Sequence, residues 1–233
     1  MQNTVTAFQS GGARALKFTL HAFGLLILIL LALNLYVPQL LGLTVHEYVG
    51  ALFLIAVLLH VSYNVFIFKA LFHNPAPYFR LRDTLTVCLL ALYALMFLSG
   101  IFISHHVFDF IHVGGRGLWR DVHVSASIYA LLLTGAHLGL HLYALLTLLG
   151  ENLGKKVARV VLLLLHLLAV NGLYVFVTGG YLDRFLMQAS FGFFDYDKSA
   201  YLIFCDLSSV FCLPLLLSYH LSRYLLYISC PRN

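Results

Sequence analysis

Six stretches of the chain are continuously apolar and long enough to cross a membrane. A helix needs about 20 residues to span the hydrocarbon core of a bilayer, and no stretch shows the apolar–polar alternation of a transmembrane β-strand. The first stretch lacks a small-residue cleavage site, so we expect it to be retained. We predict an all-α, polytopic membrane bundle of six transmembrane helices, over Phe18–Val37, Thr44–Phe68, Asp83–Ser104, Val122–Leu149, Val157–Thr178 and Ala200–Ile228.

The composition and the charges of the loops agree with this prediction. Charged residues make up 10% of the chain and mean hydropathy is +0.92, whereas soluble domains carry roughly 25% charged residues. Lys and Arg concentrate in cytoplasmic loops, so both termini are expected in the cytoplasm. The net charge of +5 then reflects contact with anionic lipid and does not point to nucleic acid. The expected inner cations are Arg14, Lys17, Lys69, Arg80, Arg82, Lys155, Lys156, Arg159, Arg223 and Arg232; the outer ones are Arg116, Arg120, Arg184 and Lys198.

Two of the predicted helices carry a pair of histidines fourteen residues apart. His46 and His60 lie on the second helix, and His123 and His137 lie on the fourth. Fourteen helical residues come within about 40° of four full turns and rise roughly 21 Å, so each pair shares a helix face. Both helices run from outside to inside, which pairs His46 with His123 and His60 with His137. Ionisable residues within membrane spans are rare and usually functional.

Two imidazoles at each level suit haem better than zinc. Zinc takes four ligands, or three and a water, whereas haem iron needs only two axial ligands from the protein. The chain has no Cys-x-x-Cys-His motif for covalent attachment. We therefore expect two non-covalent, low-spin, bis-histidine b haems. The alternative is four unrelated histidines that hydrogen-bond to neighbouring helices.

Small and basic residues near the histidines fit a bulky macrocycle. Gly50 follows one turn after the first histidine of its helix, and Gly135 and Gly139 flank His137. A missing side chain lets a porphyrin approach the backbone, although ordinary helix packing favours small residues equally. Arg120 is expected to meet a haem propionate or to anchor the helix at the interface. Glu47 and Asn64 are candidates to hydrogen-bond near the ligands.

Three groups of residues resemble the flavinylation-associated cytochrome family, with Tyr48 and Leu142 where family members often have Trp. The resemblance covers about residues Ala15–Gly150, the first four helices. It implies a di-haem b-type core over residues 15–150, with two additional helices over 151–233 in the same membrane domain. It also implies a location in the prokaryotic cytoplasmic membrane and a flavin-carrying extracytoplasmic partner. The residues are His46-Glu47-Tyr48-Val49-Gly50 with His60 and Asn64; Ser99-Gly100, Ser104 and Phe108; and His123, Tyr129 and His137-Leu138-Gly139-Leu140-His141.

Three further histidines leave alternatives open. His141 lies one turn beyond His137, where it would serve as the inner ligand instead, or contact a propionate or a quinone head group. His166 and His220 would hold a third haem, with His21 nearby, or simply hydrogen-bond within the bundle.

Other polar residues have plainer explanations. Asp206 either moves a proton to or from a quinone or bonds to a hydroxyl. Cys205 and Cys212 are interpreted as buried apolar residues. The outer loop 105–121, with His105, His106 and His112, is a candidate docking surface or aromatic belt and a weak metal signal.

Together these patterns predict transmembrane electron transfer. Electrons would pass between a membrane quinol or a cytoplasmic-side donor and an extracytoplasmic flavoprotein or cytochrome, and the sequence leaves the direction open, since quinol oxidation and quinone reduction would use the same two haems. One alternative is a haem-binding anchor subunit of a larger dehydrogenase or reductase complex. Another is a haem-free transporter that relays protons through histidines. The chain has no dinucleotide fingerprint, so no nicotinamide or flavin is expected on the chain itself.

Overall fold

The computed structural model describes residues 24, 27, 30, 31, 42–65, 68, 71, 73, 75–188 and 198–229. The chain forms two compact units, Met1–Ala70 and Leu71–Asn233. Across the described residues the secondary structure is helical and contains no strand, so the all-α prediction is confirmed. The first predicted stretch, Phe18–Val37, lies outside the described residues apart from positions 24, 27, 30 and 31.

The first unit contains a long helix, Gly42–Tyr63. Hydropathy predicted that this helix would continue to Phe68, but it ends five residues earlier. Asn64 explains the earlier end, because its side-chain amide donates a hydrogen bond to the His60 carbonyl oxygen at 2.7 Å. A polar side chain that bonds to the last turn competes with continuation of the helix, and the apolar residues that follow do not reveal this.

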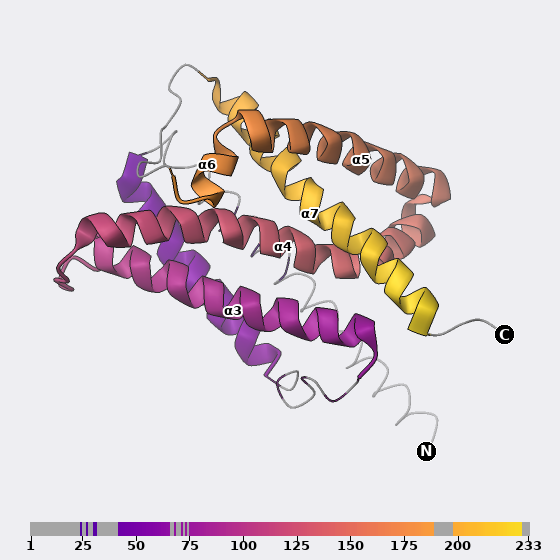
Figure 1. The fold of residues 1–233 in the computed structure, drawn as a ribbon, viewed down its shortest axis with the longest axis horizontal. Coiled ribbons are helices and arrows are strands. Elements are labelled where there is room, and N and C mark those ends of the chain that lie inside the picture. Colours follow the sequence, from indigo (N-terminus) through magenta and orange to yellow (C-terminus); the bar gives the residue numbers. More distant parts are fainter. Residues whose placement is uncertain are drawn as a thin grey trace. The chain divides into compact units, whose positions relative to one another are not determined.

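The described residues of the second unit form five helices (Figure 1). Pro77 occupies a first-turn position of α3, where its missing N–H costs nothing. Gly154 has a φ of +95° and separates α4 from α5 by one residue. α4 begins at Arg116, six residues before the predicted start, so the loop predicted over 105–121 is shorter. The helices are α3 (Pro77–Ile103), α4 (Arg116–Leu153), α5 (Lys155–Thr178), α6 (Tyr181–Phe185) and α7 (Ala200–Ser229).

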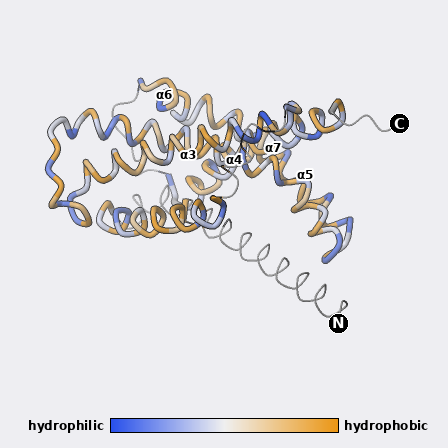
Figure 2. The backbone as a smooth tube through the Cα atoms, turned by 90° about the horizontal axis from the view of Figure 1, so that it is seen from below, coloured by the Kyte–Doolittle hydropathy of each residue, from blue (hydrophilic) through white to orange (hydrophobic). Residues whose placement is uncertain are grey.

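Among the described residues, five helices are long and apolar enough to cross a membrane: Gly42–Tyr63, α3, α4, α5 and α7. Figure 2 shows hydrophobic positions along these helices. Many outward-facing side chains are large and apolar, such as Leu163, Val170 and Leu217. Such a surface is compatible with lipid and not with water, which makes the chain a multi-pass membrane protein.

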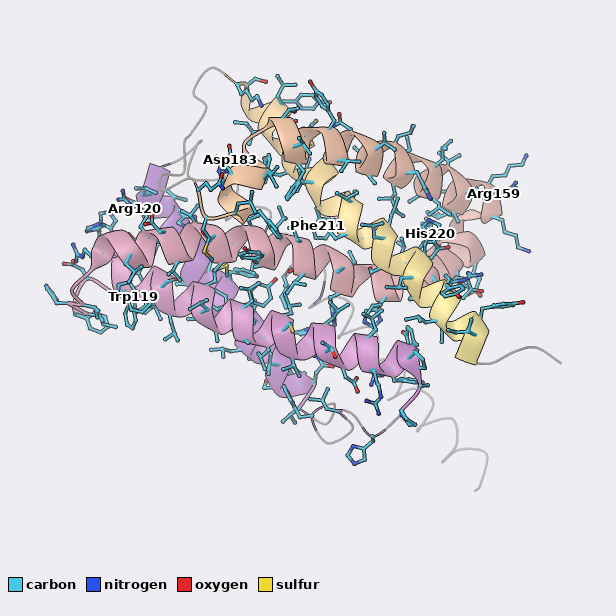
Figure 3. The ribbon with its side chains drawn as sticks, in the orientation of Figure 1. Trp119, Arg120, Arg159, Asp183, Phe211 and His220 are labelled. Carbon is cyan, nitrogen blue, oxygen red and sulfur yellow. The ribbon has the colours of Figure 1, made fainter. Side chains whose placement is uncertain are left out.

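Glycines on α4 and α5 bring these helices close to α7. A Cβ atom at Gly135 would lie 2.6 Å from the carbonyl oxygen of Phe211, a residue labelled on α7 in Figure 3. At Gly139 it would overlap the Ser218 hydroxyl and the Leu215 carbonyl, and at Gly172 the Ser209 carbonyl. Small residues at crossings are how membrane helices achieve close packing. Gly135 and Gly139 therefore serve helix packing, the alternative to a macrocycle cradle.

Polar groups strengthen the same packing. The Ser218 hydroxyl donates to the Ala136 carbonyl at 2.6 Å, which joins α7 to α4. The Asn171 amide donates to the Ser209 hydroxyl at 3.0 Å, which joins α5 to α7. α7 is thus tied to both neighbours, and the two C-terminal spans are an integral part of the second unit.

Candidate functional site

Each predicted histidine pair lies on a single continuous helix. His46 and His60 both belong to the helix Gly42–Tyr63, and His123 and His137 both belong to α4. All four residues are half-buried. The fourteen-residue spacing therefore keeps its meaning in the structure, since no break in either helix rotates one histidine away from the other. The pairing of one helix with the other remains a prediction from the sequence.

The ring of His123 is held in a defined orientation by α3. Its Nδ1 lies 2.9 Å from the Met96 carbonyl oxygen and 3.3 Å from the Ser99 hydroxyl. A carbonyl oxygen only accepts, so Nδ1 carries the hydrogen of the neutral ring. The lone pair is then on Nε2. Histidines that bind metals typically donate their other ring N–H to a carbonyl in this way, so His123 has the tautomer of an Nε2 ligand.

Gly100 provides the space that the His123 ring occupies. A Cβ atom at Gly100 would lie 3.0 Å from Cε1 and 3.3 Å from Nδ1 of that ring. Ser99, the preceding residue, is completely buried and donates its own hydrogen bond to the Met96 carbonyl at 2.9 Å. Ser99 and Gly100, two residues that belong to the family resemblance, thus both lie against the ring of His123.

We expect Gly100→Leu to displace the His123 ring. The affinity for a haem that His123 would hold should then fall at least about tenfold, the effect of losing about 1.4 kcal/mol. The added side chain has no room beside the ring, so the bond to Met96 must lengthen. The measurement is the haem content of the purified protein. Gly114→Leu is the control, because nothing lies within 4 Å of a Cβ atom there. Equal haem content in both variants would contradict the assignment.

His60 has a buried nitrogen that makes no hydrogen bond. Its Nδ1 is buried and has no hydrogen-bond partner among the described residues. Buried polar atoms without a partner are uncommon in proteins and call for a bound group, water or ion. The backbone of His60 is fixed at the same time, because Asn64 donates to its carbonyl oxygen. These features fit a residue that binds a further group.

His137 and His141 lie side by side on α4. Their ring centroids are 5.3 Å apart in an edge-to-face arrangement. His137 is half-buried and His141 is exposed. Close to them, the buried Tyr93 hydroxyl of α3 lies 2.7 Å from the Thr134 hydroxyl of α4. This link fixes α3 against α4 one turn before His137, and nothing in the spacing of these two residues indicates it in the sequence.

Three other residues were expected to lie near the ligand histidines. Gly50 and Glu47 are half-buried on the helix Gly42–Tyr63. Arg120 is exposed near the start of α4 (Figure 3). Next to it, the Trp119 ring packs edge-to-face on Phe102 of α3, with centroids 4.8 Å apart. Arg120 is therefore at a helix end, as both of its expected roles require.

His166 and His220 meet directly. Their Nε2 atoms are 3.0 Å apart, across α5 and α7. An iron between two axial imidazoles would need these nitrogens about 4 Å apart, twice a metal–nitrogen bond of roughly 2.0 Å. A third haem at this pair thus requires the two rings to separate. His21, the predicted neighbour of the pair, lies outside the described residues.

The other polar predictions have ordinary partners. Asp206 forms an ion pair with Lys198 at 3.2 Å, whereas its two expected roles were proton transfer to or from a quinone and a bond to a hydroxyl. Cys212 is buried as predicted, whereas Cys205 is half-buried. The Arg116 guanidinium lies 3.5 Å from Nδ1 of His105. Within the part of the chain that the structure describes, no three His, Cys, Asp or Glu side chains gather to hold a metal ion.

Tyr181 at the start of α6 has a strongly shifted acidity. Burial raises the pKa of Tyr181 to about 12; the Arg184 cation opposes the rise and the Asp206 carboxylate adds to it. The unfolded chain ionises this residue near pH 10. The contribution of Tyr181 to the free energy of unfolding is thus fully present below pH 10 and is lost as the pH rises toward 12.

We expect the free energy of unfolding to fall by up to about 3 kcal/mol between pH 10 and 12 because of this one group. Thermal unfolding in detergent at several pH values measures the change. Tyr181→Phe is the control, since it lacks the ionisable hydroxyl and should show a correspondingly shallower fall. Identical pH profiles for the two proteins would contradict the shifted pKa.

Comparison of the chain with protein-family models, with curated proteins and with solved structures found no match.

Proposed function

We propose that the chain is a di-haem b-type membrane cytochrome that transfers electrons across the bilayer. The observation that carries this proposal is the state of His123. Its Nδ1–H is directed to the Met96 carbonyl, which leaves Nε2 as the ligand atom, and Gly100 makes room for the ring. The same helix carries His137 fourteen residues later, and the helix Gly42–Tyr63 repeats that spacing with His46 and His60.

The residues that would hold the two haems are His46 with His123 on the outer side and His60 with His137 on the inner side. Bound haem would supply reversible one-electron exchange. The contribution of the chain is to orient each imidazole. Met96 and Ser99 do this for His123, while Asn64 fixes the backbone of His60.

The proposed partners follow from the orientation and from the family resemblance. The excess of Lys and Arg on the expected inner face supports cytoplasmic termini. Electrons would then enter from a membrane quinol or a cytoplasmic-side donor and leave to an extracytoplasmic flavoprotein or cytochrome. The same histidines would serve a haem-binding anchor subunit of a larger complex, in which case a catalytic partner would copurify.

Electron transfer across sealed vesicles tests this function. Proteoliposomes that hold ascorbate inside and ferricyanide outside should reduce external ferricyanide faster than protein-free vesicles. His123→Leu should return the rate to that of protein-free vesicles, whereas His112→Leu, in an exposed loop, should not. Equal rates with and without the wild-type protein would reject transmembrane electron transfer. A histidine-relay transporter would give that result.

A further inference from the structure

The His166–His220 pair is a polar cluster separate from the four proposed ligands. His166 is half-buried on α5 and His220 is exposed on α7. Figure 3 shows His220 toward the same end of the second unit as Arg159 of α5. Both histidines lie within predicted membrane spans, where exposed polar side chains are costly and usually functional.

The hydrogen bonds of the pair define where its protons are. Nδ1 of His166 lies 2.7 Å from the Leu162 carbonyl oxygen, so this nitrogen carries a hydrogen. In the neutral ring, Nε2 of His166 is therefore an acceptor. The Nε2 atoms are 3.0 Å apart, so Nε2 of His220 must donate across that distance. Nδ1 of His220 is consequently left with a lone pair.

That nitrogen is the acceptor that the pair presents outward. Among the described residues, Nδ1 of His220 makes no hydrogen bond. The ring lies near those of His166 and Tyr219, with centroids 5.2 and 5.0 Å away. These two contacts and the hydrogen bond to His166 restrain the ring, so this nitrogen has a defined position on an exposed residue.

The surface around this acceptor is apolar apart from one cation. The exposed residues one turn away along the two helices are Leu163 and Val170 for His166, and Leu217, Arg223 and Tyr224 for His220. The Arg223 guanidinium packs over the Tyr143 ring, 4.4 Å from its centroid. A ligand for such a place must come from the lipid phase, carry a hydroxyl donor and have an apolar body. A divalent cation fits poorly, because the pair offers two neutral nitrogens and no anionic ligand in a low-dielectric region.

We propose that the His166–His220 pair binds the head group of a lipid-dissolved hydroquinone, whose hydroxyl donates a hydrogen bond to Nδ1 of His220. The apolar residues around the pair contact the ring and tail of the ligand. The proposal rests on the proposed electron-transfer function, because that function selects hydroquinones among hydroxyl-bearing lipids. It places the quinol site on the two C-terminal spans, outside the four-helix region of the family resemblance.

Two substitutions at His220 separate the roles of its two nitrogens. The amide of glutamine ends near the position of Nε2, so His220→Gln keeps a donor toward His166 but removes the outward acceptor. The carbonyl of asparagine ends near the position of Nδ1, so His220→Asn keeps the acceptor but loses the bond to His166. His112→Gln, in an exposed loop, is the matched control.

Photolabelling of the full chain in lipid nanodiscs provides the test, with the azido derivatives of short-chain benzohydroquinone and naphthohydroquinone, kept in the reduced form, as probes. In the wild type, label competed by unlabelled decyl quinol should map to α5 and α7. His220→Gln should weaken the competing quinol about tenfold, the loss of one hydrogen bond of about 1.4 kcal/mol. His220→Asn should bind better than His220→Gln, and His112→Gln should match the wild type.

Other results would overturn the site. Label that maps outside α5 and α7, or quinol affinity that is equal in His220→Gln and the wild type, contradicts it. Loss of one haem per chain in His220→Gln would show that the pair binds haem and not quinol. Labelling does not depend on haem. A colourless protein that labels at α5 and α7 would retain this site while losing the cytochrome function. A protein that binds two haems but is not labelled at α5 and α7 would retain the cytochrome function while losing this site.

Discussion

Replacement of His123 by leucine is expected to lower the haem content of the purified protein from two b haems per chain to one. Leucine fills a similar volume but offers no ligand, and iron held by one imidazole alone loses a low-spin axial pair. The ring of His123 is oriented by α3, with Nδ1 held by Met96 and Ser99. The pyridine haemochrome assay gives the ratio directly.

Companion variants make this result specific. Ser99→Ala should keep both haems, because the Met96 carbonyl still orients the ring, and should only alter the midpoint potential. His137→Leu should lose a haem and His141→Leu should not, because His137 is the more buried of the two and has the fourteen-residue spacing. Full haem content in His123→Leu would contradict the ligand assignment.

Replacement of Gly139 by leucine is expected to prevent accumulation of a stable protein. A Cβ atom there overlaps the Leu215 carbonyl and the Ser218 hydroxyl, so α4 and α7 must separate along their crossing. Overpacking of a core costs about 1–3 kcal/mol when side chains can yield, and here a backbone atom blocks the way. The same shift breaks the bond from Ser218 to Ala136. Size-exclusion profile and thermal unfolding in detergent report the outcome.

Gly117→Leu is the matched control for this variant. Gly117 lies in the first turn of the same helix, and nothing is within 4 Å of a Cβ atom at that position. It should purify and unfold like the wild type. If Gly139→Leu behaved in the same way as Gly117→Leu, the close approach of α4 and α7 would be wrong.

The spans of the described helices were predictable because lipid demands long apolar runs, but their ends were not. The run after Tyr63 stays apolar, yet Asn64 ends the helix by bonding to the His60 carbonyl. α4 starts at Arg116, directly after Gly115 with its positive φ of 79°, and a polar turn of helix resembles a loop in a hydropathy pattern. Such ends depend on local hydrogen bonds, which apolar averages do not contain.

The glycines show a second limit of sequence reasoning. Gly135 and Gly139 next to His137 are equally suited to a macrocycle and to a helix. The structure distinguishes these two alternatives, because Phe211, Leu215 and Ser218 of α7 lie against the two glycines. A missing side chain indicates close approach, and it says nothing of what approaches.

The spacing of the histidines was the main basis for predicting the site, but it did not predict the contacts that orient these histidines. The partner of His123 is the backbone carbonyl of Met96, and a carbonyl is present at every residue. One alternative for His166 and His220 placed them together at a third haem and the other had them hydrogen-bonded within the bundle; neither specified the direct hydrogen bond between them. Side-chain spacing predicts which face a residue occupies, whereas proton positions require the acceptors around it.

The most direct test of the central claim is a reduced-minus-oxidised visible spectrum of the purified full-length protein, with a haem-to-protein ratio from the pyridine haemochrome. We expect a low-spin b-type spectrum and two haems per chain. A folded protein that is colourless and free of iron would contradict the cytochrome proposal.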